Sequence, residues 1–435
     1  MDLINIVTTD LTAITRGRAV PLDALDGHAG SGCGWVPANS ALTPQDIIAA
    51  PNPWGSHGDL RLVPDLESRM HVPSSNESRP DLHFVHGDLR TLDGEPWAAC
   101  PRTLLANELA RYADTLGWRV CSAFEHEFTL SGLDGDAPAF SLQAQRTAGA
   151  FLSQLADALA TSGNEPETLL PEYGRHQYEV TCRPALGLAS ADRAVNLREI
   201  VRDVARQCDL QTSFTPQPRV GSVSNGVHLH LSFTDREGKP VLPDNDDTDG
   251  LSPLGRHWAA GVLQYMPALC ALTAPSPVSY LRLQPHQWSS AYTCLGVRNR
   301  EAALRICPTT TLSATPRAQQ FNLEYRALDA TANPYLALAA ILIAGRLGIE
   351  QRLPLSARAD QDPDALDAGQ REALGIRALP GSLAEALSEL SQAETLVAQI
   401  PEALLATYRA IKRQELSNVA GLGNDALCDH YARIY

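Results

Sequence analysis

Residues 118–130, Trp-Arg-Val-Cys-Ser-Ala-Phe-Glu-His-Glu-Phe-Thr-Leu, are the stretch from which the fold can be inferred. The stretch comes directly after a segment with helical spacing, and its own residue types are those of a β-strand. Glu125 and Glu127 are two residues apart, so on a strand their side chains share one face. Apolar neighbours, among them Phe124 and Phe128, predict that both carboxylates are buried, and buried carboxylates require cations or hydrogen-bond donors. Because an isolated acidic residue is more often a surface charge, this pair alone leaves both interpretations open.

The sequence on either side of this strand predicts two domains. The first hundred residues are rich in Pro, Gly and Asn, which is typical of a small domain of strands and long loops. Residues 104–117 have apolar side chains at helical spacing, and strand and helix patterns alternate from there to the end. Near the end, Asn333 and Pro334 suit a helix N-cap and first position, and residues 335–349 are apolar all round, which predicts a core helix. The predicted domains are residues 1–98 and 99–435.

Two further segments carry acidic residues or histidines on predicted strands. Glu172 and Glu179 are seven residues apart. On one straight strand they would point to opposite faces, so Gly174 between them must mark a bend or bulge if they converge. His228 and His230 follow an Asn-Gly turn and share a strand face. Such a pair is a candidate for metal or phosphate binding, although a lone histidine is usually structural.

A fourth segment, residues 322–326, places Glu324 and Arg326 on one face. Five carboxylates in one cavity would repel one another unless divalent cations neutralised them, and carboxylate-rich ligand sets favour Mg²⁺ or Mn²⁺ over Zn²⁺. Nearby arginines would then hold a polyanion, and a nucleoside triphosphate bridged by two metals fits that role. Arginine-rich segments are also commonly solvated helix faces. The segment between the two histidines and residue 322 supplies the arginines in question, Arg282, Arg298, Arg300 and Arg305.

Composition excludes several classes of protein. The 435 residues include 35 Lys plus Arg against 50 Asp plus Glu, a formal charge of −15 that argues against nucleic-acid binding. Lys239 and Lys412 are the only lysines, so anion binding depends on arginine. The longest apolar run, residues 335–344, is too short to span a membrane, and the first twenty residues lack the pattern of a signal peptide. Nine scattered cysteines without a C-x-x-C motif indicate reduced thiols and a cytoplasmic location.

Five motifs, in order, resemble those of the glutamine synthetase family of ATP-dependent carboxylate-amine ligases over nearly the whole chain. The resemblance implies an α+β fold with a small N-terminal β-grasp-like domain and a large C-terminal catalytic domain built on a curved antiparallel sheet with helices. It also implies homo-oligomeric rings, possibly dodecamers, whose active sites lie between subunits. The motifs are EHEF (125–128), EYGRHQYE (172–179), NGVHLHLS (225–232), the block from Arg282 to Ile306, and LEYRALDATANPYLALAAILIAG (323–345).

The resemblance also implies a role for each of several residues, with two divalent metals and ATP as co-substrate. Glu127, Glu172 and Glu179 would hold one metal ion, and Glu125, His228 and Glu324 the other. The residues implied in ATP binding are His230, Ser232 and Arg305; in binding the transferring phosphates, Arg300 and Arg305; and in binding the amino-acid carboxylates, Arg282, Arg300 and Arg326.

Two departures from the family pattern favour an organic amine over ammonia as the second substrate. Trp288 stands where the family has a flap glutamate that closes over the intermediate, and residues 37–42 lack the acid that attracts ammonium. A buried Trp would instead offer apolar contact worth about 1.5–3 kcal/mol to an organic group. Trp288 as plain core packing is the alternative. His286 in the same flap is a candidate general base because an unshifted imidazole titrates near neutrality.

The resemblance leaves the acid substrate and the activity partly open. The family's Asn-Gly pair that contacts the amino acid aligns with Val223-Ser224, and His176 replaces a usual glycine. We therefore expect glutamate, or a relative of it, to be joined to an organic amine through a γ-glutamyl phosphate, in amine metabolism. The alternatives are a glutamine synthetase that uses ammonia, a non-catalytic binding or regulatory subunit, and a two-metal hydrolase.

Overall fold

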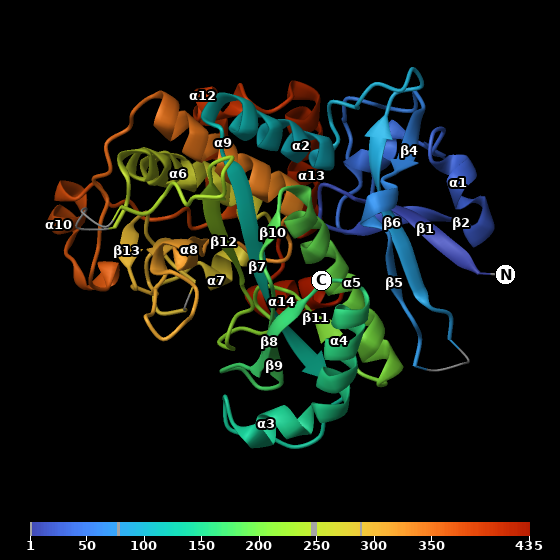
Figure 1. Cartoon of the computed structure of the whole chain (residues 1–435), viewed down its shortest axis with the longest axis horizontal. Coiled ribbons are helices and arrows are strands. Elements are labelled where there is room, and N and C mark those ends of the chain that lie inside the picture. Colours follow the sequence, from blue (N-terminus) through green and yellow to red (C-terminus); the bar gives the residue numbers. More distant parts are fainter. Residues whose placement is uncertain (1, 76–78, 245–249, 288) are drawn as a thin grey trace.

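The computed structural model describes residues 2–75, 79–244, 250–287 and 289–435. Its first sheet contains the strands β1 (Leu3–Thr9), β2 (Thr15–Pro21), β3 (Cys33–Trp35), β4 (Leu60–Pro64), β5 (Met70–Val72) and β6 (Leu82–Arg90). The order is β2-β1-β6-β4-β3, with β5 paired to β6. β1 and β2 form an antiparallel hairpin, whereas β1 and β6 are parallel. This mixed sheet, blue in Figure 1, is the expected β-grasp-like unit.

The second sheet is larger and is antiparallel except where β13 pairs with β14. Its path is β13-β14-β15-β12-β7-β9-β8, with β10 and β11 paired to β7. Its strands are β7 (Arg119–Ser131), β8 (Pro166–Pro171), β9 (Gln177–Cys182), β10 (Ala185–Leu186), β11 (Gln211–Ser213), β12 (Val227–Thr234), β13 (Leu295–Val297), β14 (Leu304–Ile306) and β15 (Leu323–Tyr325).

The strand β7 has two unlike faces, and this difference positions the site. Burial alternates along the strand, so Phe124 and Phe128 point into the core while Glu125 and Glu127 point to the other face. The sequence suggested that the apolar neighbours would bury the carboxylates, and the structure shows that they do not, because they lie on the opposite face of β7. Neighbouring strands cover them instead, because the alternation of a strand sends adjacent residues to opposite sides.

Helices surround the larger sheet, and α5 packs directly on β7 (Figure 1). The short helices of the first domain are η1 (Leu22–Ala24), α1 (Leu25–His28), η2 (Pro37–Ala41) and η3 (Leu66–Ser68). The second domain contains α2 (Pro101–Arg111), the π-helix η4 (Tyr112–Leu116), α3 (Leu142–Thr147), α4 (Gly149–Thr161), α5 (Leu188–Gln207), α6 (Pro253–Thr273), α7 (Ser279–Arg282), α8 (Arg317–Gln320), α9 (Pro334–Glu350), η5 (Pro363–Ala365), α10 (Ala368–Ala373), α11 (Leu383–Gln392), α12 (Glu394–Val397), α13 (Glu402–Asn418) and α14 (Asn424–Ala432).

The core helix predicted from Asn333 onward is confirmed as α9. The Asn333 side-chain oxygen accepts a hydrogen bond of 2.9 Å from the Leu336 amide, which caps the helix. Its side-chain nitrogen donates to the carbonyl oxygens of Thr9 and Asp10, so the same residue ties the two domains together. α9 lies so close to α6 that a Cβ at Gly261 would overlap the Ala344 carbonyl.

The architecture confirms the α+β class expected from the sequence, with a small N-terminal and a large C-terminal sheet. β6 ends at Arg90 and α2 begins at Pro101, and the domain boundary at residue 98 stays a prediction within that interval. Among the described residues, none of the helices is long and apolar enough to cross a membrane.

Candidate active site

Strand register brings the predicted metal ligands together. The strands β9, β7, β12, β15 and β14 are neighbours in the sheet, and each contributes at least one charged side chain to the same face. Residues far apart in the sequence therefore become direct cross-strand partners. The pairs are Glu125 with His228, Glu127 with Glu179, Glu324 with His230, and Glu324 with Arg305.

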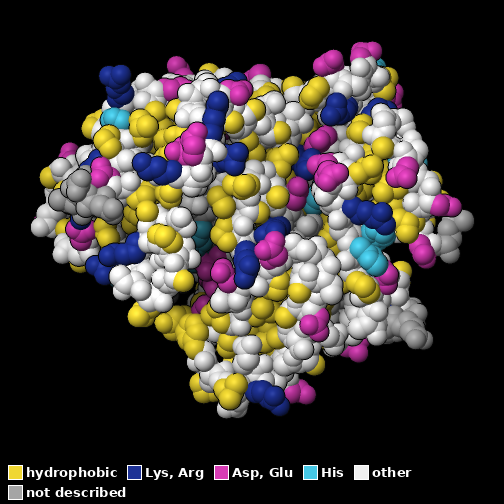
Figure 2. Space-filling view, in the orientation of Figure 1, with side chains coloured by type: hydrophobic (Ala, Val, Ile, Leu, Met, Phe, Trp, Pro, Cys, Tyr) yellow, Lys and Arg dark blue, Asp and Glu magenta, His cyan; other side chains and the backbone are white. Residues whose placement is uncertain are grey.

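The donor atoms form two overlapping groups that fit a metal ion. One group is Glu125, Glu179 and His228, and the other is Glu125, His230 and Glu324, with the donor atoms of each group within 4.8 Å of one another. His228 Nδ1 lies 3.0 Å from Glu125 and 3.6 Å from Glu324. His230, expected at ATP alone, thus also reaches the carboxylates. Figure 2 shows acidic and histidine side chains in a hollow near the centre of the face in view.

One atom of this cluster points to an absent ligand. His228 Nε2 is buried and has no hydrogen-bond partner among the described residues. Neutral imidazole nitrogen and carboxylate oxygen are both ligands of divalent ions, and a buried nitrogen without a partner is costly in a protein. The residues present therefore fit a divalent metal ion, with carboxylates of the cluster as its other ligands.

Without metal, the clustered carboxylates do not all ionise. Burial, and then the charges of Glu125, Glu127 and Glu172, raise the pKa of Glu179 to about 10. Burial and the Glu127 charge raise the pKa of Glu172 to about 7. Burial also acts on Glu125, but hydrogen bonds from His228 and from the second histidine of β12 outweigh it and hold the Glu125 pKa well below its usual value. The cluster thus holds protons that a bound cation would displace.

The bend between Glu172 and Glu179 is present, and Gly174 lies in it, as predicted: the Gln177 amide donates to the Gly174 carbonyl oxygen at 3.1 Å, and a Cβ at Gly174 would clash with the Gln177 side chain. β8 ends at Pro171 and β9 begins at Gln177, so a short turn separates the two strands. His176 occupies the left-handed region with φ of 53°, a conformation that glycine adopts more easily. This is the position where the resemblance expected a glycine. The turn brings Glu172 close enough to Glu179 that the charge of Glu172 helps to raise the pKa of Glu179.

Arginine side chains complete the face. Arg305 Nη1 lies 2.7 Å from Glu324, and Arg326 also pairs with Glu324. Burial raises the Glu324 pKa, but the charge of Arg326, then those of the histidines and Arg305, lower it to about 2. Arg282 is buried, donates to the Arg326 carbonyl at 3.3 Å and packs where a Cβ at Gly226 would clash. Its Nη1 and the Nε of Arg305 have no partner among the described residues, so both can donate to an anion.

Three of the predicted residues lie apart from this cluster or outside the described residues. Arg300 is exposed near Glu172, where its charge opposes the rise in the pKa of that carboxyl. His286 is exposed and its Nε2 lies 2.9 Å from Asp362, a hydrogen bond that raises the pKa of the imidazole. Among the described residues, His286 forms ion pairs with Asp362 and Asp364 and not with the carboxylates of the cluster. Trp288 lies outside the described residues.

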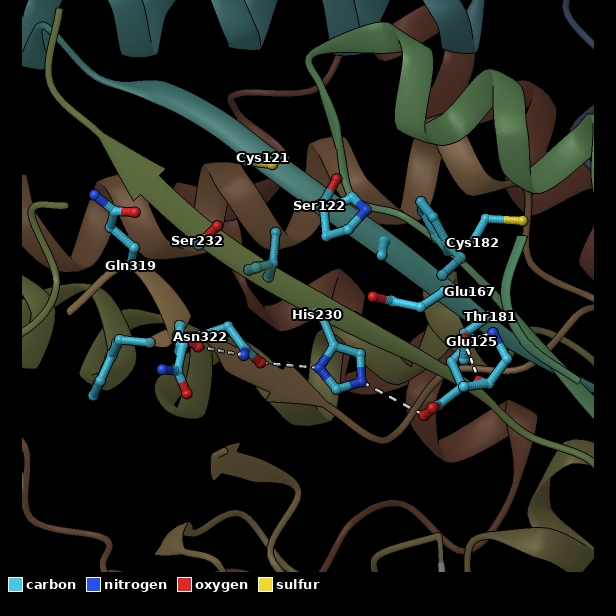
Figure 3. A pocket seen from close by; sticks show the side chains of 17 residues that line it. Cys121, Ser122, Glu125, Glu167, Thr181, Cys182, His230, Ser232, Gln319 and Asn322 are labelled. Atoms are coloured by element: carbon cyan, nitrogen blue, oxygen red, sulfur yellow. Dashed lines mark hydrogen bonds and ion pairs between the residues drawn. The ribbon is translucent and has the colours of Figure 1, made fainter. Parts of the chain in front are cut away.

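A cavity of about 390 Å³ lies beside Glu125 and is lined by residues of β7 and β12 (Figure 3). Glu125, His230 and Ser232 line it, so two of the three residues expected at ATP face one space; Arg305, the third, is not among the residues that line it. His230 Nδ1 donates to the Asn322 side-chain oxygen at 2.9 Å, and Nε2 points toward Glu125. The volume of the cavity is within the usual range for a small-molecule pocket.

Sequence reasoning missed Cys121, which lines this cavity, and Cys307, which contacts the cluster beside it. Cys121 is the cross-strand partner of Ser232, and Cys307 contacts both His230 and Glu324, at 3.7 Å and 3.6 Å. Cys121 could have been found, because it lies four residues before Glu125 on the same strand face. Cys307 follows the end of β14 in an irregular segment, and no spacing rule predicts its position.

Comparison with known proteins identifies the family. The family model for the glutamine synthetase catalytic domain matches residues 98–429, and that for the glutamine synthetase N-terminal domain matches residues 1–97. The chain belongs to the glutamine synthetase family. Its members are ATP-dependent ligases that use divalent metal ions, bind glutamate with an amine or ammonia, and form oligomers.

Curated relatives within the family differ in the amine they are named for. The chain is 34% identical over 432 residues to the gamma-glutamylpolyamine synthetase GlnA3 of Streptomyces coelicolor, covering 97% of this chain and 91% of the relative. It is 31% identical to the glutamine synthetase of Halobacterium salinarum, covering 86% and 83%. The curated relatives thus include both a gamma-glutamylpolyamine synthetase and a glutamine synthetase.

Two solved structures share the fold over nearly the whole chain. A structure described as a novel glutamine synthase homolog is 57% identical, with a TM-score of 0.93 and coverage of 100% of this chain and 98% of that one. A GmaS/ADP complex is 25% identical, with a TM-score of 0.82 and coverage of 97% and 95%.

Metal affinity at this site is expected to rise steeply with pH. In the metal-free protein Glu172 and Glu179 keep protons up to about pH 7 and about pH 10, and a metal ion must displace them. Between pH 6 and pH 7 we expect the Mn²⁺ or Mg²⁺ dissociation constant to fall at least about tenfold. Calorimetry in two buffers of different ionisation enthalpy would measure both the affinity and the protons released. An affinity that is constant over this range would contradict the proton assignment.

Proposed function

We propose that this glutamine synthetase family member joins the γ-carboxylate of glutamate to an organic amine, in an ATP-dependent reaction that forms a γ-glutamyl phosphate. The observation that carries the ligase part of the proposal is the cross-strand register that gathers Glu125, Glu127, Glu179, His228 and Glu324 beside a nucleotide-sized cavity. The ions proposed are Mg²⁺ or Mn²⁺, two in each site, because the ligand set is dominated by carboxylate oxygen.

The first step transfers a phosphoryl group. The γ-carboxylate oxygen attacks the γ-phosphorus of ATP, the bond to the β,γ-bridging oxygen breaks, and ADP leaves. Arg300 and Arg305 are the residues that we propose hold the transferring phosphoryl group, with Arg282 and Arg326 on the amino-acid carboxylates. When bound, the divalent ions neutralise phosphate charge and orient the nucleotide. Ser232 and His230 line the nucleotide cavity and position ATP.

The second step forms the amide. The neutral amine nitrogen attacks the acyl carbon, the carbon–oxygen bond to phosphate breaks, and inorganic phosphate leaves while a proton leaves the nitrogen. His286 is the proposed acceptor of that proton. Its hydrogen bond to Asp362 orients the imidazole, and the raised pKa places its neutral, proton-accepting form toward alkaline pH.

Three observations support an organic amine. Trp288 replaces the flap glutamate of authentic glutamine synthetases, and η2 at residues 37–41 has no acidic side chain where the family has one. The Streptomyces coelicolor relative is named for polyamines. Loss of anionic groups weakens binding of a small ammonium ion, and an aromatic side chain favours an organic substituent.

An assay of ADP release with glutamate and each of several amines tests this proposal. We expect alkyl or aryl amines to support a kcat/KM at least about a hundredfold above that of ammonium, because even a few buried CH₂ groups contribute about 0.8 kcal/mol each. The variant Trp288→Ala should lower the value for the organic amine and leave that for ammonium little changed.

Three other results would each replace the proposal. Turnover with ammonium alone at millimolar concentration would make the protein a glutamine synthetase. Absence of Mg·ATP binding by the purified assembly would indicate a non-catalytic subunit. Amide cleavage without nucleotide would indicate a hydrolase.

We also propose a homo-oligomeric ring with sites between subunits, which sedimentation of the assembled protein would test.

A further inference from the structure

A second cavity, of about 310 Å³, adjoins the carboxylate cluster at Glu172. Glu172 belongs both to this cavity, which it lines, and to the carboxylate cluster, where it interacts with the charges of Glu127 and Glu125. The rest of its wall comes from the loop before α3, from α3 itself, and from the turn between β8 and β9. The volume is at the lower end of the range for small-molecule pockets. A molecule in this space would therefore reach the reacting centre at Glu172.

The wall beyond Glu172 combines small apolar side chains with polar ones, among them Thr147, His176 and Gln177. Ala137, Ala139 and Ala144 form part of it. Asp136 and Arg175, both on the wall, form an ion pair through Nε of the arginine, so their charges cancel. The alanines give an uncharged group apolar contact, whereas a second ammonium group would gain no net attraction from the neutral ion pair and would lose part of its hydration.

An exposed aromatic pair stands next to this wall. Phe140 and Tyr173 meet edge to face, with ring centroids 4.7 Å apart, and are 49% and 54% exposed. Tyr173 lines the cavity, and Phe140 follows Ala139, which lines it as well. Aromatic side chains offer large contact areas to apolar ligands. The rim is therefore apolar.

We infer that this cavity receives the apolar substituent of a primary monoamine, a short alkyl or aryl group without a second charge. The inference rests on the proposed function and specifies its amine. The reactive nitrogen would lie at the Glu172 end, next to the carboxylate cluster, and the carbon chain would lie along the alanine wall. Polyamines, the class named for the Streptomyces coelicolor relative, would be poorer substrates because the neutral ion pair on the wall gives a second ammonium group no net attraction.

Butylamine and 1,4-diaminobutane test this inference as a matched pair, since they differ only in the terminal group. We expect the assembled enzyme with ATP, Mg²⁺ and glutamate to show a kcat/KM at least about tenfold higher for butylamine, the discrimination that pocket contacts of this size commonly reach. A value equal to or higher for the diamine would overturn the inference.

Two variants locate the effect in the cavity. Ala139→Phe should fill the space and lower kcat/KM for butylamine about tenfold or more, mainly through KM, while the same-site reaction with ammonium changes little. The control is Ala113→Leu, at an exposed alanine on the π-helix η4. It should change the kinetics neither with butylamine nor with ammonium. Arg175→Gln leaves Asp136 uncompensated and should raise the diamine-to-butylamine ratio about two- to fivefold, the scale of an exposed ion pair.

The outcomes separate this inference from the proposed function. If organic amines are turned over but Ala139→Phe leaves butylamine kinetics unchanged, the cavity assignment is wrong and the ligase proposal stands. If neither amine is turned over while ammonium is, the proposed function itself is wrong.

Discussion

Replacing Glu324 with Ala is expected to lower ATP-dependent turnover at least about a thousandfold and to reduce the free energy of unfolding by about 3–5 kcal/mol. Glu324 is 1% exposed and pairs with both Arg305 and Arg326, so its removal leaves two buried guanidinium groups without their anion. The same change removes a ligand from the group with Glu125 and His230. Steady-state ADP release and chemical unfolding measure the two effects.

A matched control separates loss of chemistry from loss of folding. Glu108 is also buried and pairs with Arg346 at 2.7 Å, far from the carboxylate cluster. Glu108→Ala should destabilise the protein to a similar extent but keep kcat near the parent value at temperatures where it is folded. If Glu324→Ala retains more than about a tenth of the parent turnover under those conditions, Glu324 is not a metal ligand.

Replacing Glu179 with Gln is expected to increase the free energy of unfolding at pH 7, in contrast to the Glu324 variant, and to abolish metal-dependent activity. The folded, metal-free protein holds Glu179 protonated at pH 7 because its pKa is about 10, whereas the unfolded chain ionises it near 4.5. Ionisation therefore favours the unfolded state, and this preference grows as pH rises from about 4.5 toward 10. Gln does not ionise in either state, so the variant should gain up to about 3 kcal/mol at pH 7 and nothing at pH 4.

The sign of that effect distinguishes a strained carboxylate from an ordinary buried one. Glu415 is fully buried too, but it accepts from Lys412 at 2.8 Å, so Glu415→Gln should destabilise the protein at pH 7. Urea unfolding of both variants with EDTA, at pH 4 and pH 7, makes the comparison. With Mn²⁺ present, the parent should gain stability and Glu179→Gln should not. A Glu179→Gln variant that is less stable than the parent at pH 7 without metal would contradict the pKa assignment.

The sequence predicted the local structure around the site well. The strand through Glu125 and Glu127 and the strand through His228 and His230 are β7 and β12, and the spacing of two correctly placed each pair on one face. The capped helix at Asn333 is also confirmed. These features depend on neighbours in the chain, and local spacing therefore predicts them.

Other parts of the site followed from no local pattern. The bend at Gly174 was predicted, but the positive φ of His176 in the same turn was not, because residues other than glycine adopt that conformation less often. Burial of the carboxylates was predicted for the wrong reason, because Phe124 and Phe128 lie on the opposite face of β7. Cys307 and the second cavity arise from loops whose paths are set by tertiary contacts.

The sequence by itself determined which residues share a strand face, which helix is core, and, through five ordered motifs, the family. Tertiary structure alone decided that β7 pairs with β12 and β9 in the register that sets Glu125 opposite His228 and Glu127 opposite Glu179. Alternation along a strand is a property of neighbouring residues, whereas register between distant strands depends on side-chain packing across the whole sheet. The protonation of Glu179 and the neutral ion pair on the wall of the second cavity follow from that packing, because both depend on charges that only the folded chain brings together.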